Sequence, residues 1–432
     1  MVAETFASSL WSSLTPKGPE LPRLRGSVEA DVLVVGAGLL GLSHAFHLAE
    51  TGARVVVLEA QEVGFGASGR NTGFVIPSLR SRLSADELDE RLGVGRGARL
   101  MRLVTESGDT VFDLIRRLGV DCAAEQSGWL QPAHSAAMAP VLEKRVHAAR
   151  GRGGRVDMLD ARETARRIGT NGFYGALLDH SGGQINPLAY ARGLARAGID
   201  KGVTIHEHSP VTGIVREAPM WRATTEDGTV RAPQVLFTTN ALIGRFMPEL
   251  ADSIVPARAH QIATQIFPED VRKRVIPERN PIADTRRHTF AVRWSPDGRL
   301  VTGGLMLAGP RLAERTARTF TKRLERFFPD IGRVKAEFIW NGVIAVTTDS
   351  LPRFISLGPG LDAVIGCNGR GVALTTALGR DIAHVYAGRL DMHDFALPHR
   401  PPVPVPGRRL AQIGPHLWLP WSNLRDRWEG GR

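Results

Sequence analysis

The sequence predicts an α/β fold: a parallel, Rossmann-like sheet near the N-terminus joined to a discontinuous α+β domain built on an antiparallel sheet. Three observations support this prediction. Residues 30–60 have the order of a parallel βαβ crossover, namely strand, glycine-rich turn, helix and second strand. Residues 361–388 repeat the order strand, glycine-rich turn and helix. Turn sequences at Asp227-Gly228 and at Pro296-Asp297-Gly298 indicate antiparallel hairpins.

The opening crossover is built from three short segments. Val32–Val35 is an apolar, β-branched run, which is typical of a strand buried in a parallel sheet. Apolar side chains between positions 39 and 49 recur at helical spacing, and Gly52 suits the end of that helix. Val55–Leu58 is predicted as the second buried strand.

The rest of the chain alternates in type. We expect helices over residues 186–202 and 317–330 and strands over residues 203–208 and 213–217. Residues 221–242 are expected to form a hairpin followed by a strand that ends at Thr239-Asn240, and residues 288–304 a second hairpin. Residues 1–28, anchored by Trp11, and the Pro-, Arg- and Trp-rich residues after Ala396 are expected to be irregular.

The composition limits the class of protein. The chain has 432 residues, of which 43% are hydrophobic and 23% charged, as is usual for a globular protein. It has neither the ~20 uninterrupted apolar residues of a membrane span nor a signal pattern, so we expect no integral membrane association and a cytoplasmic location. The net charge of +11 comes from scattered Arg rather than basic blocks, so no nucleic-acid partner is expected. Cys122 and Cys367 cannot form a CxxC zinc site, and no metal site is expected.

A GxGxxG motif follows the first strand, at Gly36, Gly38 and Gly41. In this context the glycines permit a tight turn, close approach of the backbone to a pyrophosphate, and packing of the helix on the strand. Glu59 ends the second strand, near the ~20-residue spacing of an acid that binds ribose hydroxyls. NAD and FAD both use this motif, so it leaves the two open. The predicted dinucleotide-binding residues here are Gly36, Gly38, Leu39, Leu40, Gly41, Glu59 and Ala60.

The segment EVGFGASGRNTGF, residues 62–74, favours FAD. In an NAD enzyme this region normally begins another crossover. Together with residues 30–60, the segment resembles the D-amino-acid-oxidase-like superfamily of FAD-dependent enzymes, most closely the branch that contains gamma-glutamylputrescine oxidoreductase. The resemblance continues through SGGQINPLAYARGLA (181–195), QIAT (261–264), WNGVIAVTTDSLP (340–352) and GCNGRGVALTTALGR (366–380).

This resemblance implies noncovalent FAD in a domain of the glutathione-reductase type, because no Cys or His stands at a position of covalent attachment. Residues implied along the pyrophosphate, ribityl chain and flavin are Ser68, Gly69, Arg70, Asn71 and Gly73, although Arg70 could instead form an ion pair. Val211 would cover the adenine, and Thr239 and Asn240 would close the adenosine site. Residues implied at a helix N-terminus facing the flavin are Gly369, Arg370, Gly371 and Val372.

The implied domains are discontinuous. Residues 1–28 would be an N-terminal arm and residues 398–432 a C-terminal tail. The FAD-binding domain would comprise residues 29–80, 170–243 and 352–397, and the substrate domain residues 81–169 and 244–351.

The sequence departs from the family at the expected substrate site. Many amino-acid oxidases of this fold carry a carboxylate-binding Arg four residues after the Trp of the WxG segment, whereas this chain has Ile344. That favours an amine substrate. Arg370 stands where close relatives have His, and could hold the flavin or bind an anionic tail. The remaining pocket candidates are His260, Arg293 and Trp340, each with an alternative as a strand-edge, ion-paired or core residue; no catalytic residue is assigned.

The predicted function is FAD-dependent oxidation of a C–N bond in a small-molecule amine or amino-acid derivative. Hydride transfer to flavin N5 would give an imine, and its hydrolysis an aldehyde or keto product. The electron acceptor could be O2 or a quinone or protein carrier. The alternatives are a flavin-dependent tRNA-modifying enzyme, a D-amino acid or N-methyl amino acid dehydrogenase, a protein that holds FAD without turnover, and an NAD-dependent dehydrogenase.

Overall fold

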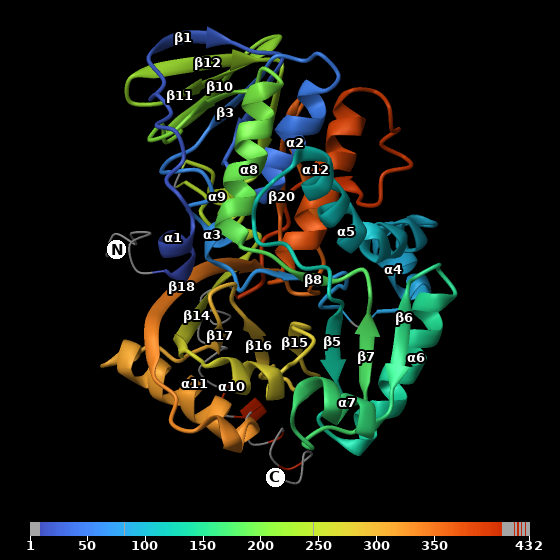
Figure 1. Cartoon of the computed structure of the whole chain (residues 1–432). Coiled ribbons are helices and arrows are strands. Elements are labelled where there is room, and N and C mark those ends of the chain that lie inside the picture. The colour runs from blue at the N-terminus through green and yellow to red at the C-terminus, as the bar shows by residue number, and fades with distance from the viewer. Residues whose placement is uncertain are drawn as a thin grey trace.

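The computed structural model describes residues 9–81, 83–244, 246–407, 419, 421, 422, 425 and 428. Two sheets with their helices form the upper part of Figure 1, and an eight-stranded sheet with its own helices forms the lower part. The chain passes between the two parts several times, so each part is assembled from segments distant in sequence.

The central sheet of the upper part has seven strands. Its order is β21 (His399–Arg400), β19 (Arg353–Gly358), β20 (Leu361–Ile365), β13 (Gln234–Phe237), β2 (Val32–Val35), β3 (Val55–Leu58) and β9 (Thr204–His206). The run from β20 to β9 is parallel, and β19 is antiparallel to β20. Crossover connections therefore bring the carboxyl ends of the parallel strands to one edge, which faces the lower part.

Helices cover one face of this sheet and a second sheet covers the other. Alternate side chains Val32 and Val34 of β2 pack with the helices, whereas Leu33 and Val35 pack with the second sheet, as the period of two requires. The helices of the upper part are α2 (Leu39–Ala49), α4 (Ala85–Leu92), α5 (Arg96–Leu118), α8 (Pro187–Asp200) and α12 (Gly371–Tyr386). The second sheet runs β1 (Gly26–Glu29), β12 (Gly228–Ala232), β11 (Met220–Thr224), β10 (Gly213–Glu217).

The lower sheet is antiparallel except between β15 and β5. Its order is β18 (Ala336–Val346), β14 (Val255–Ile266), β17 (Arg299–Leu305), β16 (Ala291–Trp294), β15 (Ile282–Ala283), β5 (Trp129–Pro132), β7 (Ala176–Asp179) and β6 (Val156–Leu159). The helices of this part are α6 (Ala139–Arg150), α7 (Ala161–Ile168), α10 (Glu269–Arg274) and α11 (Leu312–Phe327), with 3₁₀ turns at Ala136–Met138 and Pro329–Ile331. α7, α10 and α11 lie on the side away from the upper part (Figure 1).

Short elements join the two parts. They are α1 (Leu10–Leu14), α3 (Ala67–Arg70), α9 (Pro248–Asp252) and the two-stranded ribbon of β4 (Phe74–Val75) and β8 (Gly183–Gln184). α1 is a helix in the arm that was expected to be irregular, and its Trp11 is fully buried. The predicted crossover and both predicted hairpins are present, and the overall fold class is as the sequence predicts.

Two elements pack with a different part of the molecule from the one that the predicted domain ranges give them. β7 falls in the range 170–243, expected in the FAD-binding domain, yet it pairs with β5 and β6 of the lower sheet. α5 falls in the range 81–169, expected in the substrate domain, yet it packs against α12 of the upper part (Figure 1). Sequence periodicity does not show the sheet or helix against which an element packs.

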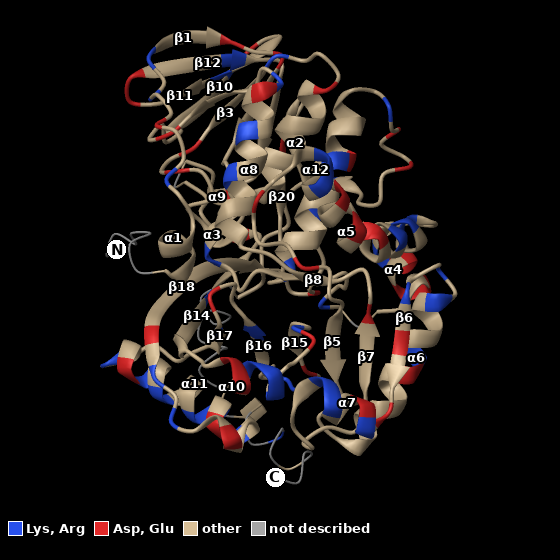
Figure 2. Ribbon diagram, viewed as in Figure 1, with Lys and Arg blue, Asp and Glu red and all other residues tan. Residues whose placement is uncertain are grey.

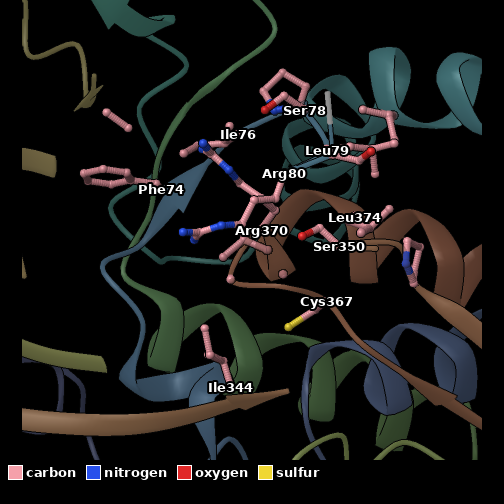
Figure 3. A pocket seen from close by; sticks show the side chains of 18 of the residues that line it. Phe74, Ile76, Ser78, Leu79, Arg80, Ile344, Ser350, Cys367, Arg370 and Leu374 are labelled. Carbon is pink, nitrogen blue, oxygen red and sulfur yellow. The ribbon is translucent and has the colours of Figure 1, made fainter. Parts of the chain in front are cut away.

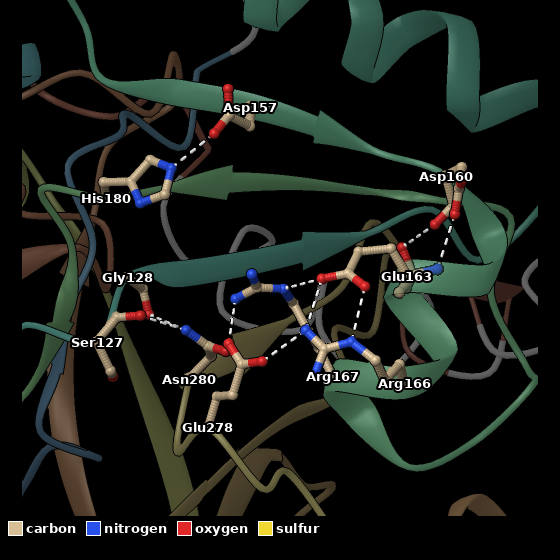
Figure 4. Close-up of polar contacts among 11 residues, drawn as sticks. Ser127, Gly128, Asp157, Asp160, Glu163, Arg166, Arg167, His180, Glu278 and Asn280 are labelled. Atoms are coloured by element: carbon tan, nitrogen blue, oxygen red, sulfur yellow. Dashed lines mark hydrogen bonds and ion pairs between the residues drawn. The ribbon is translucent and has the colours of Figure 1, made fainter.

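Many of the Lys and Arg side chains form ion pairs with acidic side chains. In the view of Figure 2, cations and anions are interspersed over the outer helices. One such network joins α7 to the segment before β15: Glu163 and Glu278 each bind both Arg166 and Arg167 (Figure 4). Surface pairs of this kind contribute at most about 1 kcal/mol each. Among the described residues, no helix has the length and apolar character needed to cross a membrane.

Candidate functional site

The turn between β2 and α2 depends on its glycines. Gly36 has φ of +108°, in the left-handed region that glycine tolerates best. A Cβ on Gly38 would lie 2.8 Å from Ser68 Oγ, and one on Gly41 would lie 2.6 Å from Thr238 Oγ1. The backbone of this turn therefore approaches its neighbours more closely than any side chain would allow.

The N-terminus of α2 is open to an anion. Its N-cap, Gly38, has no side chain to satisfy the first N–H groups, and the first turn has no acidic residue. Leu39 N donates a hydrogen bond to Ser68 Oγ at 3.0 Å. Because unpaired N–H groups and the helix dipole favour negative charge, this terminus suits a phosphate group.

Glu59 lies at the end of β3, beside the same turn. Its carboxylate accepts hydrogen bonds from Ala37 N at 2.8 Å and Gln61 N at 3.0 Å. Burial raises the pKa of Glu59, an effect that these backbone hydrogen bonds oppose. The Glu59 carbonyl accepts a hydrogen bond from Ser209 N at 2.8 Å, which brings the segment leading to Val211 alongside this end of the site.

The segment after β3 is held by Asn71 and Arg70. Asn71 donates to Ser68 O at 2.7 Å and accepts from Gly73 N at 2.7 Å, so it shapes the turn after α3. The Arg70 carbonyl accepts from Gln261 Nε2 and Trp340 Nε1, both at 2.8 Å, which attaches α3 to β14 and β18.

The Arg70 side chain is itself buried. Its Nε donates to Phe65 O at 3.0 Å, and its guanidinium lies over the Phe65 ring. Trp340 is also buried, in edge-to-face contact with Trp11 at 6.3 Å between ring centroids.

A cavity of about 1490 Å³ lies between the upper and lower parts. Its wall includes the N-termini of α2 and α12, the segment after α3, strand β5 and the upper faces of β14, β17 and β18. Figure 3 shows Ile344 of β18 and Arg370 at the start of α12 among the side chains that line it. Ten predicted residues line the cavity: Gly38, Leu39, Leu40, Ser68, Asn71, Asn240, Gly369, Arg370, Gly371 and Val372.

The other predicted residues lie outside this wall. One group belongs to the region of the β2–α2 turn and the end of β3: Gly36, Gly41, Glu59, Ala60 and Val211. The second group lies behind the lining residues: Gly69, Arg70, Gly73, Thr239, His260, Arg293 and Trp340.

Two of the pocket candidates face away from the cavity for identifiable reasons. Ala257, Ala259 and Gln261 of β14 line the cavity, so the pleat directs His260 to the opposite face. Burial, with a smaller contribution from Arg258, lowers the pKa of His260 to about 4.

Arg293 braces the glycine turn from behind. Its Nη1 donates to Gly73 O at 2.9 Å and Ile185 O at 2.6 Å, and its guanidinium lies over Trp11 at 5.2 Å. Burial lowers the pKa of Arg293 to about 9. Its hydrogen bonds to other described residues all go to backbone carbonyls, so this geometry gives it a structural rather than a substrate-binding position.

The turn before α12 is organised by two asparagines. Asn240 accepts from Gly366 N at 3.0 Å, and Asn368 accepts from Thr347 N at 2.9 Å. Arg370 is the N-cap of α12 and provides no capping hydrogen bond, so this helix N-terminus is also open to the cavity. Cys367 lies in the same turn, and burial raises the pKa of its thiol.

The cavity wall carries a positive excess. Among the described residues of the wall, seven are Lys or Arg and three are Asp or Glu. Burial lowers the pKa of Arg370 to about 9, and repulsion from Arg80 and Arg145 acts in the same direction. The guanidinium of Arg370 lies over the ring of Trp129 at 5.3 Å.

Sequence reasoning missed several residues of this wall. Arg80 and Trp129 were not singled out, and Gln261 was noted only within the QIAT segment. Gln261 Oε1 is buried without a hydrogen-bond partner among the described residues, as is Trp129 Nε1. The alternation of β14 puts Gln261 and His260 on opposite faces without showing which face meets the cavity, and Arg80 has no local signal.

Comparison with known proteins places the chain in context. The profile of the family described as "FAD dependent oxidoreductase" (DAO) matches residues 31–385. Gamma-glutamylputrescine oxidoreductase of Escherichia coli (strain K12) is 32% identical, over 97% of this chain and 98% of that protein. The probable oxidoreductase OrdL of Haemophilus influenzae is 30% identical over 85% of each protein.

Solved structures share the fold at lower identity. The crystal structure of glycine oxidase from Geobacillus kaustophilus matches with a TM-score of 0.71 and 21% identity, over 86% of this chain and 98% of that one. L-proline dehydrogenase from P. horikoshii matches with a TM-score of 0.71 and 17% identity, over 85% of this chain and 96% of that one.

Proposed function

The chain belongs to the family of FAD-dependent oxidoreductases, and from that premise we propose that it oxidises the C–N bond of a small-molecule amine or amino-acid derivative. The relatives named above include an oxidoreductase of gamma-glutamylputrescine and, among solved folds, an oxidase of glycine. The observation that carries the proposal is the positively charged cavity, which extends between two uncapped helix N-termini.

The residues present fit FAD. The N-cap Gly38 carries no side chain, a Cβ there would lie 2.8 Å from Ser68 Oγ, and the cavity runs from the N-terminus of α2 to that of α12. We assign Glu59 to the ribose, Gly38, Leu39 and Ser68 to the pyrophosphate, and the backbone of residues 369–372 to the flavin. When bound, FAD supplies the acceptor for the hydride removed from the carbon next to the substrate nitrogen.

The cofactor is proposed to be held noncovalently. Cys367 is the cysteine in the cavity wall, and burial keeps its thiol protonated by raising its pKa. A protonated thiol is a poor nucleophile. Acid precipitation should therefore release all of the flavin into the supernatant; flavin that stays with the pellet would contradict this assignment.

The protein's own charges favour an amine in its neutral form. Cations near an ammonium group raise its energy, which lowers the pKa of the amine. Oxidation at the neighbouring carbon requires the nitrogen lone pair, so the positive excess of the wall prepares the substrate without a side-chain base. Gln261 offers a buried acceptor, Oε1, to an N–H donor bound in the cavity, and its Nε2 is fixed by Arg70 O.

Ile344 supports an amine rather than a free α-amino acid held by a strand-borne Arg. Its side chain lines the cavity (Figure 3), on the same face of β18 as Gly342 and Val346. An apolar side chain there excludes water and offers no bidentate partner for a carboxylate.

The test is an anaerobic screen of the purified, FAD-loaded protein. Amines, polyamine derivatives, N-methyl amino acids and D-amino acids would be added while the flavin absorbance near ~450 nm is followed. We expect rapid bleaching by at least one amine class, and bleaching by D-amino or N-methyl amino acids alone would overturn the role given to Ile344. Reoxidation by O2 compared with quinones would identify the acceptor, which stays a prediction, as does the cytoplasmic location.

A further inference from the structure

The side of the lower part that lies away from the upper part combines exposed cations with exposed tryptophans. We propose that this surface, formed by the solvent-facing side of α11 and the helical residues of the C-terminal tail, binds the surface of a bilayer that contains anionic phospholipids. The proposal goes beyond the proposed function and does not depend on it, because lipid binding can be measured without turnover.

The solvent-facing side of α11 is basic. The opposite, buried side of this helix carries one residue at every fourth position: Thr316, Phe320 and Leu324. A cation follows each of these by two positions, which is about 200° around the helix axis, and each is exposed: Arg318, Lys322 and Arg326. The helix therefore presents a row of three positive charges to the solvent.

The row has no counter-charge from the described part of the chain. None of its three cations forms an ion pair there, whereas Arg323, on the flank of the same helix, donates to the His288 carbonyl at 2.7 Å. The two acids of the helix have other roles. Glu325 accepts from Val334 N at 2.9 Å, and Glu314 lies in the first turn, where it complements the helix dipole. The row is therefore available to an anionic partner.

The tail supplies a second exposed helical face. The sequence led us to expect an irregular tail, yet its described residues are helical: Leu419, Trp421, Ser422, Arg425 and Trp428. Leu419 and Ser422 are buried, while Trp421, Arg425 and Trp428 are exposed and follow one another at spacings of four and three, so they share one side of the helix. Trp428 is 82% exposed and Trp421 is 49% exposed. Large apolar side chains gathered on an exposed face indicate a binding surface.

Contacts join the tail to α11. The guanidinium of Arg287 lies over the ring of Trp421 at 5.6 Å, and the next residue, His288, is the one whose carbonyl binds Arg323 of α11. Both helical faces therefore belong to the lower end of the molecule in Figures 1 and 2. Arg287 also lines the cavity, so a bilayer bound to this surface would lie beside that part of the cavity wall.

The chemistry of the surface favours lipid over nucleic acid. Tryptophan concentrates at the boundary between headgroups and acyl chains, and Lys and Arg are attracted by anionic headgroups. Trp421 and Trp428 share their side of the helix with Arg425, which is the pattern of a helix that lies in the plane of a membrane interface. A nucleic-acid duplex would engage the cations of α11 but offers no apolar layer to Trp428.

Cosedimentation with vesicles tests the surface directly. The FAD-loaded protein would be mixed with vesicles of phosphatidylcholine alone, or of phosphatidylcholine and phosphatidylglycerol. We expect roughly tenfold or greater preference for the anionic vesicles and a blue shift of tryptophan fluorescence on binding. Raising the salt from about 0.1 M to about 1 M should weaken binding by roughly tenfold or more, because salt screens the attraction. Equal binding to both kinds of vesicle, no binding, or tighter binding to a DNA duplex would overturn the proposal.

Charge variants then locate the contact. The triple variant R318Q/K322Q/R326Q should bind anionic vesicles roughly tenfold or more weakly, because each cation near the surface contributes to the attraction. The matched control removes the same charge from exposed positions of the upper part: R23Q/R25Q/K201Q. We expect the control to bind nearly as tightly as the parent, and both variants to unfold in urea as the parent does. An equal loss of binding in the two variants would show attraction by net charge alone and would overturn the assignment to α11.

Replacing Trp428 tests the contribution of the tail. W428A should weaken binding to anionic vesicles and reduce the blue shift without changing stability, because this side chain is 82% exposed, and W428F should recover part of the loss. Unchanged binding by W428A would refute the role of the tail. A dimer in solution that W428A disrupts, and that anionic vesicles do not dissociate, would assign the surface to a second copy of the chain instead.

Flavin bleaching separates this proposal from the proposed function. Anaerobic bleaching by amines should be the same in the parent and in all of these variants, because none of the substituted residues lines the cavity. Lipid binding without bleaching by any amine would refute amine oxidation alone, whereas bleaching without selective lipid binding would refute the docking surface alone.

Discussion

Replacing Gly41 by Ala tests whether α2 must lie as close to β2 as the structure places it. The new Cβ would lie 2.6 Å from Thr238 Oγ1 and 3.1 Å from Val34 Cγ1, and closer still to the carbonyl oxygen of Gly36. Ordinary contacts begin at 3.4 Å, and a backbone carbonyl cannot rotate away, so the helix must shift. Overpacking of this kind costs about 1–3 kcal/mol.

The helix preference for Ala over Gly, about 1 kcal/mol, partly offsets that cost. We therefore expect G41A to lose about 2 kcal/mol of unfolding free energy if the strain lies at the upper end, as contact with a fixed backbone atom implies. A shift of α2 also displaces the N–H groups at its N-terminus, and losing one hydrogen bond to a charged group costs about 1.5–3 kcal/mol, or tenfold or more in FAD affinity.

Urea unfolding of the FAD-free protein measures the first effect, and a fluorescence titration of FAD measures the second. G198A is the matched control, because a Cβ at Gly198 in α8 would meet Val203 at an ordinary 3.5 Å. It should be unchanged or stabilised by up to about 1 kcal/mol. The reasoning is refuted if G41A is as stable as G198A and binds FAD as tightly as the parent.

Three further predictions follow from named contacts. E59A should weaken FAD binding at least tenfold, because ribose hydroxyls lose their acceptor; unchanged affinity in a titration would remove Glu59 from the site. His44 and His47 are buried with pKa values lowered by burial to about 3 and about 4, so the unfolded state binds more protons below the ordinary pKa of about 6.5. The unfolding free energy is then at its full value above about pH 6.5 and falls as the pH drops, by about 2 kcal/mol per histidine at pH 5. H47L should halve the loss of unfolding free energy between pH 7 and pH 5, as measured by urea unfolding at the two pH values. R293M should lose about 3 kcal/mol or more of unfolding free energy, because carbonyls of Gly73 and Ile185 lose their donor, yet its substrate preference in the anaerobic screen should not change.

The sequence pattern was sufficient to predict the bounds of those elements that short-range interactions determine. Val32–Val35, the helix from Leu39 to Ala49 and Val55–Leu58 have the bounds that the sequence predicts, because strand burial, glycine turns and helical spacing all agree there. The hairpin turns at Asp227-Gly228 and around Asp297 are likewise local signals.

The candidate site was only partly predictable, since side-chain direction depends on tertiary packing. Arg293 and His260 are polar residues on strands, and nothing nearby in sequence says which face of the sheet meets the cavity. Arg293 became a brace because the glycine turn leaves carbonyls of Gly73 and Ile185 that need a donor. Arg80, an unremarked residue between two elements, reaches the cavity only because the ribbon of β4 and β8 directs the chain past the start of α12.

One electrostatic pattern connects the fold to the proposed chemistry. The topology places the N-termini of α2 and α12 at the carboxyl edge of the upper sheet, and Arg80 and Arg370 face the same cavity. All four contributions have the same sign, so they favour phosphates, a carboxylate and the negative charge that a flavin gains on reduction, and they disfavour an ammonium group. R370Q should therefore lower the flavin reduction potential, which a redox titration with a reference dye can measure. An unchanged potential would show that Arg370 does not act on the flavin.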